Sequence, residues 1–205
     1  KNMSSASFVE SHIQIGDATA PNQVACYLDL HCPFSQRLLP KIKLATEQND
    51  NLGAKVHLYV QPWHPQAGYM TMAVFAVQVL APNKALAMVE KIYSHVNPCK
   101  VNGEAKQAEA GDLFSDVAVA DKTPLQIIAS LAELANQTAG IDSDTFTTTI
   151  SGSQVHQLMK HSTKIGRQNG IHATPTVLIN GLVDNNLSSG WPPEQVAAYL
   201  ATPKM

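Results

Sequence analysis

The sequence is short of the cysteines that a disulfide-stabilised scaffold needs and of the apolar runs that cross membranes. Its three cysteines allow at most one disulfide bond and leave one thiol over. No apolar stretch approaches the ~20 residues of a membrane-spanning helix. The net charge of −2 at pH 7 gives no basic excess for binding nucleic acid. We therefore expect partners that are neither nucleic acids nor membranes.

Recognisable patterns for metal ions and phosphates are also missing. The eight histidines show no His-x-x-x-His spacing and the cysteines no Cys-x-x-Cys spacing, so we predict no metal site. The glycines are isolated and form no phosphate-binding loop. The 205 residues, 44% of them hydrophobic, are enough to bury a core as one domain or as a domain with an insertion.

The most informative segment that is present joins an apolar run over 24–30 to the residues His-Cys-Pro-Phe-Ser. Pro33 stands where the first turn of a helix accepts proline, because the first helical N–H groups have no partner within the helix. Cys32 is therefore predicted at a strand-to-helix junction, where the helix dipole favours thiolate over thiol. A thiolate is the nucleophile of disulfide exchange. Ser35 takes the place of the second cysteine of a Cys-x-x-Cys pair.

A second segment places Thr174 and Pro175 directly before a β-branched run that ends in Asn180 and Gly181. A proline cannot donate to the hydrogen-bond ladder of a sheet, so it suits the first residue of a strand. The Asn-Gly pair that closes the run is typical of a tight hairpin turn.

Together the two segments resemble the thioredoxin fold, in which a redox motif follows one strand and a cis-proline precedes a later one. The long separation of Cys32 and Pro175 resembles the DsbA-like branch of that superfamily, which carries an inserted helical domain. The resemblance implies an α/β fold, with a discontinuous thioredoxin-like domain over 1–65 and 150–205 and an inserted α-helical domain over 66–149. It also implies that the peptide bond before Pro175 is cis and that this proline packs against the Cys32 sulfur.

Three short segments narrow the resemblance: Tyr27–Ser35, Val60–Pro65 and Ser188–Trp191. They look like a eukaryotic, mostly uncharacterised family of DsbA-like proteins in which Cys-Pro-x-Ser is a natural form. Residue chemistry and resemblance together predict a catalytic group made of Cys32, Ser35 and Pro175. The residues expected to bind substrate around it are His31, Pro33, Phe34, Trp63, His64 and Thr174.

Several of these residues have an alternative interpretation. The Ser35 hydroxyl either donates a hydrogen bond to the Cys32 thiolate or merely caps the helix. His31 either stabilises the thiolate as an imidazolium or is a solvated ring. Trp63 and His64 either line the site or pack between the sheet and the insertion.

The two other cysteines are interpreted differently from Cys32. Cys26, in the middle of the apolar strand, is expected in the core. Cys99, in a predicted loop of the insertion, is the less favoured candidate for a remote thiol that resolves mixed disulfides. In thioredoxin a buried acid stands at the offset of Cys26 and shuttles protons, and a thiol is a poor replacement for it. Asp29 is the only acid of the strand, but it has a different offset.

Apolar spacing predicts the remaining elements. Strands are expected over 8–15, 24–30, 55–61 and 176–179 and near 182–183. Helices are expected over 35–48, 68–80, 83–94, 124–137, 147–170 and 193–201.

Three functions fit these residues. The first is monothiol thiol–disulfide exchange through Cys32, with a protein, a peptide or glutathione as the thiol or disulfide partner and no bound cofactor. The second is a glutathione-dependent transferase or isomerase of the kappa type, with glutathione along the Thr174–Pro175 edge. The third is a redox-inactive thioredoxin-like module that binds an extended peptide beside Pro175 by strand addition.

The cellular compartment follows from weaker signals. The sequence begins at Lys1 and not at methionine, which indicates a removed leader. Sequons for N-glycosylation occur at Asn2, Asn136 and Asn186. We therefore expect the secretory pathway or the extracellular space, with the cytoplasm as the alternative.

Overall fold

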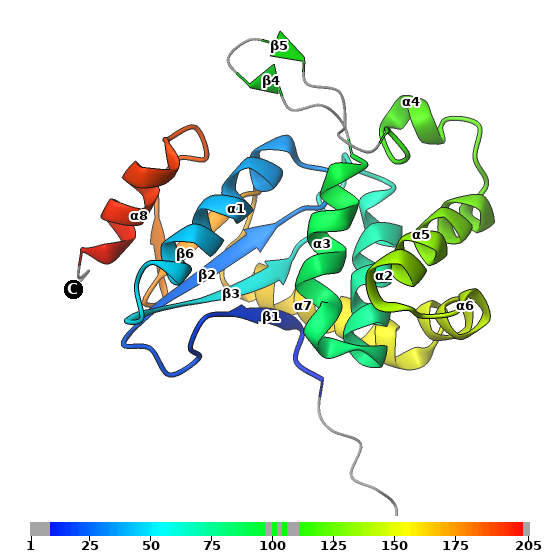
Figure 1. The fold of residues 1–205 in the computed structure, drawn as a ribbon, viewed down its shortest axis with the longest axis horizontal. Helices are drawn as coiled ribbons and strands as arrows, with labels where there is room; N and C mark the ends of the chain where they lie inside the picture. Colours follow the sequence, from blue (N-terminus) through cyan, green and yellow to red (C-terminus); the bar gives the residue numbers. More distant parts are fainter. Residues whose placement is uncertain (1–8, 97–99, 102–103, 106–110, 203–205) are drawn as a thin grey trace, which may run out of the picture.

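The computed structural model describes residues 9–96, 100–101, 104–105 and 111–202. Its centre is a five-stranded sheet of β1 (His12–Ile15), β2 (Asn22–Leu28), β3 (Leu52–Leu58), β6 (Thr176–Ile179) and β7 (Leu182–Asp184). The strands lie in the order β1-β3-β2-β6-β7 (Figure 1). Only β2 and β3 pair in parallel, and the other neighbours are antiparallel.

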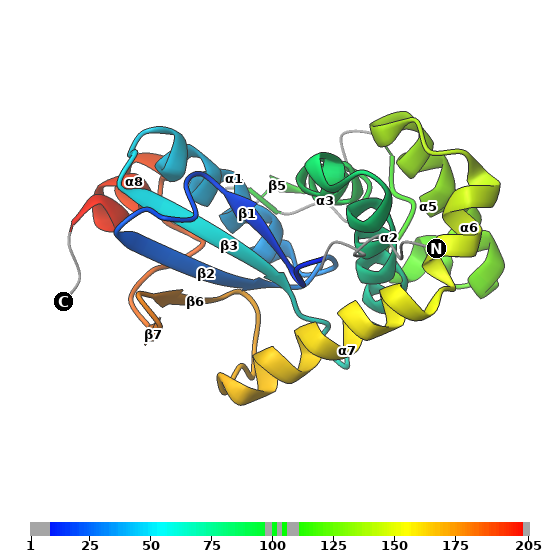
Figure 2. The ribbon, with the colours of Figure 1, turned by 90° about the horizontal axis from the view of Figure 1, so that it is seen from below.

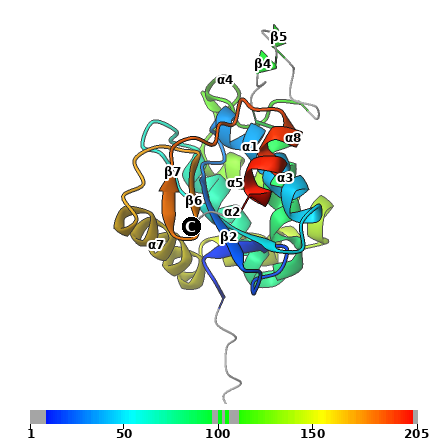
Figure 3. The ribbon, with the colours of Figure 1, turned by 90° about the vertical axis from the view of Figure 1, so that its left-hand side faces the viewer.

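Helices cover both faces of this sheet. Helix α1 (Pro33–Glu47) connects the parallel strands β2 and β3 and packs against α8 (Pro193–Ala201) on one face. Helix α7 (Ser153–Gln168) runs along the other side (Figure 2). Seen from the α8 end, β6 and β7 lie in front and the helices of the insertion lie behind (Figure 3). The sheet is therefore buried between helical layers.

The insertion consists of helices that lie beyond one end of the sheet (Figure 1). Its central helix, α2, is buried on nearly all sides because α3, α5, α6 and α7 all pack against it. Within the described residues, none of the helices is both long and apolar enough to cross a bilayer. The elements are α2 (Ala67–Leu80), η1 (Pro82–Lys84), α3 (Ala85–Ser94), β4 (Lys100–Val101), β5 (Glu104–Ala105), α4 (Asp116–Val119), α5 (Pro124–Ala139) and α6 (Ser143–Ile150).

The C-terminal elements agree with the sequence prediction. Strand β6 and helix α8 have the predicted bounds, and the hairpin between β6 and β7 turns at Asn180 and Gly181. Both turn residues have positive φ, 50° and 85°, as a two-residue hairpin turn requires. The predicted strand over 8–15 is shorter in the structure, and Phe8 lies outside the described residues.

The prediction of one long helix over 147–170 is wrong. The segment contains two helices, α6 and α7, which are separated at residues 151–152. Gly152 is extended, with φ −75° and ψ 157°, and a Cβ added to it would lie 3.0 Å from the Thr149 carbonyl oxygen. Glycine therefore lets the chain pass close to the last turn of α6. Helix α6 also begins earlier than predicted, because Asp142 caps it by accepting a hydrogen bond from the Thr145 N–H.

A close contact at Gly166 packs α7 against the sheet. A Cβ added to Gly166 would lie 2.3 Å from two ring carbons of Tyr59, which directly follows β3. Gly166→Ala should therefore destabilise the fold by about 1–3 kcal/mol through overpacking, as measured by urea denaturation. Gly68→Ala, in a helix position with open space around it, is the matched control and should not destabilise. Equal free energies of unfolding for the Gly166→Ala variant and the parent would contradict this packing.

Candidate active site

Cys32 lies where the chain passes from the central strand into α1. It is the N-cap residue of α1, with Pro33 at the first helical position, as the sequence predicts. Its Sγ donates to the Thr174 carbonyl oxygen at 3.3 Å, and its backbone N–H donates to the Asp29 carbonyl oxygen at 3.1 Å. The first turn of α1, all of which the structure describes, holds no acidic side chain that would oppose a thiolate.

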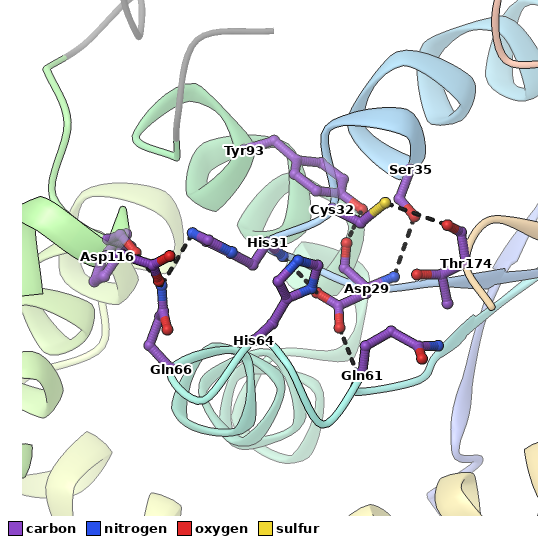
Figure 4. Close-up of polar contacts among 11 residues, drawn as sticks. Asp29, His31, Cys32, Ser35, Gln61, His64, Gln66, Tyr93, Asp116 and Thr174 are labelled. Atoms are coloured by element: carbon purple, nitrogen blue, oxygen red, sulfur yellow. Dashed lines mark hydrogen bonds and ion pairs between the residues drawn. The ribbon is translucent and has the colours of Figure 1, made fainter. Parts of the chain in front are cut away.

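The loop before β6 meets Cys32 from the other half of the chain. The Thr174–Pro175 peptide bond is cis, and the Thr174 carbonyl is the acceptor of the Cys32 thiol (Figure 4). The two segments singled out in the sequence are therefore in direct contact. In this packed arrangement only 5% of Cys32 is accessible to solvent.

Cys26 belongs to the core, as predicted. It is completely buried in β2, and burial raises the pKa of its thiol to about 12. Cys26 and Cys32 are both free thiols. Cys99, the candidate for a remote resolving thiol, lies outside the described residues.

The contrast between the two described thiols gives a test of reactivity. Brief alkylation near neutral pH should modify Cys32 well before Cys26, because Cys32 lies at a helix N-terminus whereas burial suppresses ionisation of Cys26. Given the pKa of Cys26, its rate should be lower by at least about a hundredfold. Peptide mapping by mass spectrometry measures both sites in one sample. Labelling of Cys26 first would exclude Cys32 as the nucleophile.

Ser35 is buried beside Cys32 but does not cap the helix. Cys32 holds the N-cap position, so the capping interpretation is wrong. The Ser35 Oγ accepts a hydrogen bond from the Asp29 N–H at 3.3 Å. The hydroxyl hydrogen is not used in that bond, and its donation to a Cys32 thiolate stays a prediction.

Asp29 is the residue that the sequence prediction noted but left out of the site. Its carboxylate is buried and accepts two backbone N–H groups, from His31 at 2.7 Å and from Gln61 at 2.6 Å. The Asp29 carbonyl oxygen also accepts from the Tyr93 hydroxyl of α3 at 3.2 Å. Asp29 thereby links three parts of the chain: the loop over 29–32, which we call the cysteine loop, the loop after β3 and the insertion. The available signal was a single acid at the end of an otherwise apolar strand.

The two candidate histidines lie under the cysteine loop. His64 places its Nδ1 3.1 Å from the Asp29 Oδ1, and its ring meets the His31 ring edge-on at 4.7 Å. The His31 ring is buried and reaches away from Cys32 toward Gln66 (Figure 4). Burial, and then the neighbouring His64, lower the pKa of His31. The interpretation of His31 as a solvated ring is therefore wrong, and burial disfavours the thiolate-stabilising imidazolium.

Two aromatic side chains near the site are open to solvent. Phe34, next to Pro33 in the first turn of α1, is 51% exposed, and the Arg37 guanidinium carbon lies 4.8 Å from the centre of its ring. Trp63 is 60% exposed, so the alternative of packing between sheet and insertion is wrong for this residue. The packing alternative describes His64 better, because its side chain is only 15% exposed.

The sheet, the helix-capping cysteine and the Thr-Pro loop against it define a thioredoxin-like protein with a helical insertion. A family model described as thioredoxin matches residues 9–191, and the chain belongs to this family. Among curated protein sequences, none matches the chain.

Solved structures agree with this assignment. The chain is similar to a proposed protein-disulfide isomerase from Pseudomonas syringae, with 26% identity and a TM-score of 0.70 over 92% of this chain and 97% of that one. BdbD from Bacillus subtilis has 16% identity and a TM-score of 0.66, over 93% and 91% of the two chains. The thiol-disulfide exchange protein α-DsbA2 from Wolbachia pipientis has 16% identity and a TM-score of 0.63, over 93% and 86%. The fold is therefore that of the DsbA-like branch.

Proposed function

We propose that the chain is a monothiol thiol–disulfide exchange protein that acts through Cys32. The observation that carries this proposal is the 3.3 Å contact between the Cys32 Sγ and the Thr174 carbonyl at the N-terminus of α1. This contact brings a thiol at the start of a helix next to the Thr174–Pro175 backbone, which we propose as the edge that binds an extended substrate. A general disulfide-exchange role is also what the thioredoxin-like fold supports.

The proposed reaction has two steps. The Cys32 thiolate attacks one sulfur of a disulfide, forms a mixed disulfide with it and releases the other sulfur as a thiolate. A second thiolate, from outside the chain, then attacks the mixed disulfide and regenerates the Cys32 thiolate. Each step exchanges one sulfur–sulfur bond for another, so no net oxidation occurs. Ser35 cannot carry out the second step, because a hydroxyl does not take part in sulfur exchange.

Glutathione is the small thiol that we propose as the partner in these steps. A glutathione-dependent kappa-type reaction is the related alternative, with the Thr174–Pro175 edge holding the peptide and Cys32 or Ser35 polarising its thiol. Both proposals need no cofactor. The secretory or extracellular location also stays a proposal, and it suits a reaction that needs disulfide substrates.

The solvent exposure of the side chains around Cys32 favours one further candidate function, that of a redox-inactive peptide-binding module. Phe34 and Trp63 present large apolar surfaces to solvent while the Cys32 thiol is almost covered. In that function an extended peptide contacts these rings and the Thr174–Pro175 edge, and Cys32 undergoes no chemistry.

Incubation with glutathione disulfide distinguishes these functions. An exchange protein should gain the mass of one glutathione at Cys32 and lose it again when reduced glutathione is added. Cys32→Ser should gain nothing at this position, and Cys26→Ala is the control that should behave as the parent does. An intact protein that stays unmodified over hours, while still binding a peptide, would contradict exchange and support the binding module.

A further inference from the structure

The side chains of Asp29 and His64 lie against each other beneath the cysteine loop. Their Oδ1 and Nδ1 atoms are 3.1 Å apart, and the Asp29 side chain is fully buried. The two residues come from different loops, one after β2 and one after β3, and both point into the space under Cys32 (Figure 4). Neither takes part in the exchange steps described above.

Hydrogen bonds hold Asp29 in a fixed relation to the first turn of α1. The Asp29 carbonyl accepts from the Cys32 N–H at 3.1 Å, and the Asp29 N–H donates to the Ser35 Oγ at 3.3 Å. Asp29 is therefore locked to both ends of the first turn of α1. Both of its carboxylate oxygens accept backbone N–H groups, an arrangement that suits the negatively charged form.

A buried negative charge at this place opposes ionisation of Cys32. Like charges disfavour each other, so a carboxylate without a counter-ion makes the thiolate less stable. A protonated imidazole 3.1 Å from the carboxylate cancels most of that repulsion. Among the described residues, His64 is a side chain in contact with the Asp29 carboxylate that can carry a positive charge.

We propose that His64 is the counter-ion of Asp29 and a positioning residue that preserves the thiolate of Cys32 at neutral pH. This inference rests on the proposed function, in which the Cys32 thiolate is the nucleophile. His64 acts through Asp29 and does not touch the sulfur. On ionisation of Cys32 the thiol proton leaves to solvent.

The other titratable groups that face the pair do not replace His64. His31 contacts His64 edge-on, but burial disfavours its charged form. Asp112 and Asp116, from the insertion, act on His31 and add only negative charge. Tyr93 of α3 contributes a neutral hydroxyl to the Asp29 carbonyl. The charge balance under Cys32 therefore depends on His64.

The test measures alkylation of Cys32 against pH in three variants, with peptide mapping to follow this cysteine alone. His64→Gln should reduce the rate at pH 7 by at least about threefold and move the midpoint of the pH profile upward. His64→Lys keeps a positive charge without the imidazole and should restore most of the rate. His156→Gln, an exposed histidine of α7, is the control and should leave the profile unchanged.

The Asp29→Asn variant completes a double-mutant cycle with His64→Gln. It should raise the alkylation rate, and adding His64→Gln to it should have no further effect, because the charge to be cancelled is gone. If Asp29→Asn does not fold, the inference is tested by comparing the alkylation profiles of His64→Gln and His64→Lys. An unchanged profile for His64→Gln, or an equal loss in His64→Gln and His64→Lys, would overturn the inference and leave His64 a structural role. A parent that forms no mixed disulfides, with a shifted profile in His64→Gln, would instead reject the proposed function only.

Discussion

Ser35→Cys should convert the chain from an exchanger of disulfides into a donor of them. The variant places two thiols one helical turn apart at the start of α1, a spacing compatible with the geometry of a disulfide bond. Glutathione disulfide first oxidises the two thiols to an internal disulfide and is reduced to glutathione. A thiolate of the reduced substrate then attacks the Cys32 sulfur and releases the new thiolate, and a second substrate thiolate attacks this mixed disulfide, so that the substrate leaves with a disulfide and both thiols of the variant are reduced. We expect the rate of oxidation of a reduced, unfolded test protein to exceed that of the parent by at least about tenfold.

Three outcomes of this experiment separate the competing functions. Cys32→Ser should abolish both mixed-disulfide formation and oxidation, whichever residue occupies position 35. A Ser35→Cys variant that forms its internal disulfide but transfers it to no substrate would favour the peptide-binding module. A parent that already oxidises the test protein and loses this activity on Cys99→Ala would identify Cys99 as the resolving thiol, contrary to the monothiol mechanism.

The free energy of unfolding should fall by about 3 kcal/mol between pH 6.5 and pH 4 because of His57 alone. Its ring is buried in β3 and stacks on Tyr27 with the ring centres 4.7 Å apart. Burial, followed by the positive charges of His12, Lys55 and His161, lowers the pKa of His57 from 6.5 to about 4. In the unfolded chain the imidazole takes up a proton at higher pH than it does in the fold. The contribution of His57 is therefore complete above pH 6.5 and is lost as the pH falls to about 4.

His57→Phe is the variant that tests this pH dependence. Phenylalanine preserves an aromatic ring against Tyr27 but cannot take up a proton, so the free energy of unfolding should decline less steeply below pH 6.5 than in the parent. Urea denaturation at several pH values measures both curves, and His156→Gln serves as the exposed histidine control. Parallel curves for parent and His57→Phe would show that His57 is not the group responsible.

Local signals in the sequence predicted the parts of the fold that depend on near neighbours. The two prolines at 192 and 193 set the start of α8, and the Asn180-Gly181 turn set the β6–β7 hairpin. The Cys-Pro junction likewise predicted the start of α1 to within two residues. Helix α7 was misjudged because a single glycine, Gly152, interrupts an otherwise helical pattern.

The polar contacts of the site could not be predicted in the same way, because they join residues that are far apart in the chain. Asp29 becomes important only through the Gln61 backbone and the His64 ring, which come from the loop after β3. His31 is adjacent to Cys32 in sequence, yet its ring turns toward Gln66 of the insertion and is buried there. Chemical type alone indicated a charged or solvated histidine, whereas the tertiary environment decides its charge.

The hydrogen bonds of Tyr93 bear on how freely the helical insertion could be exchanged between relatives. The Tyr93 hydroxyl holds the Asp29 carbonyl, and the Tyr93 carbonyl accepts from the Gln36 side chain of α1 at 2.6 Å. The insertion is thus fastened to the residues on either side of Cys32. A chimera that keeps this sheet but takes its helices from a homologue keeps the hydrogen bond to the Asp29 carbonyl only if the donor also brings a hydroxyl to that place. An exchange of the helices would therefore also change what supports the cysteine loop.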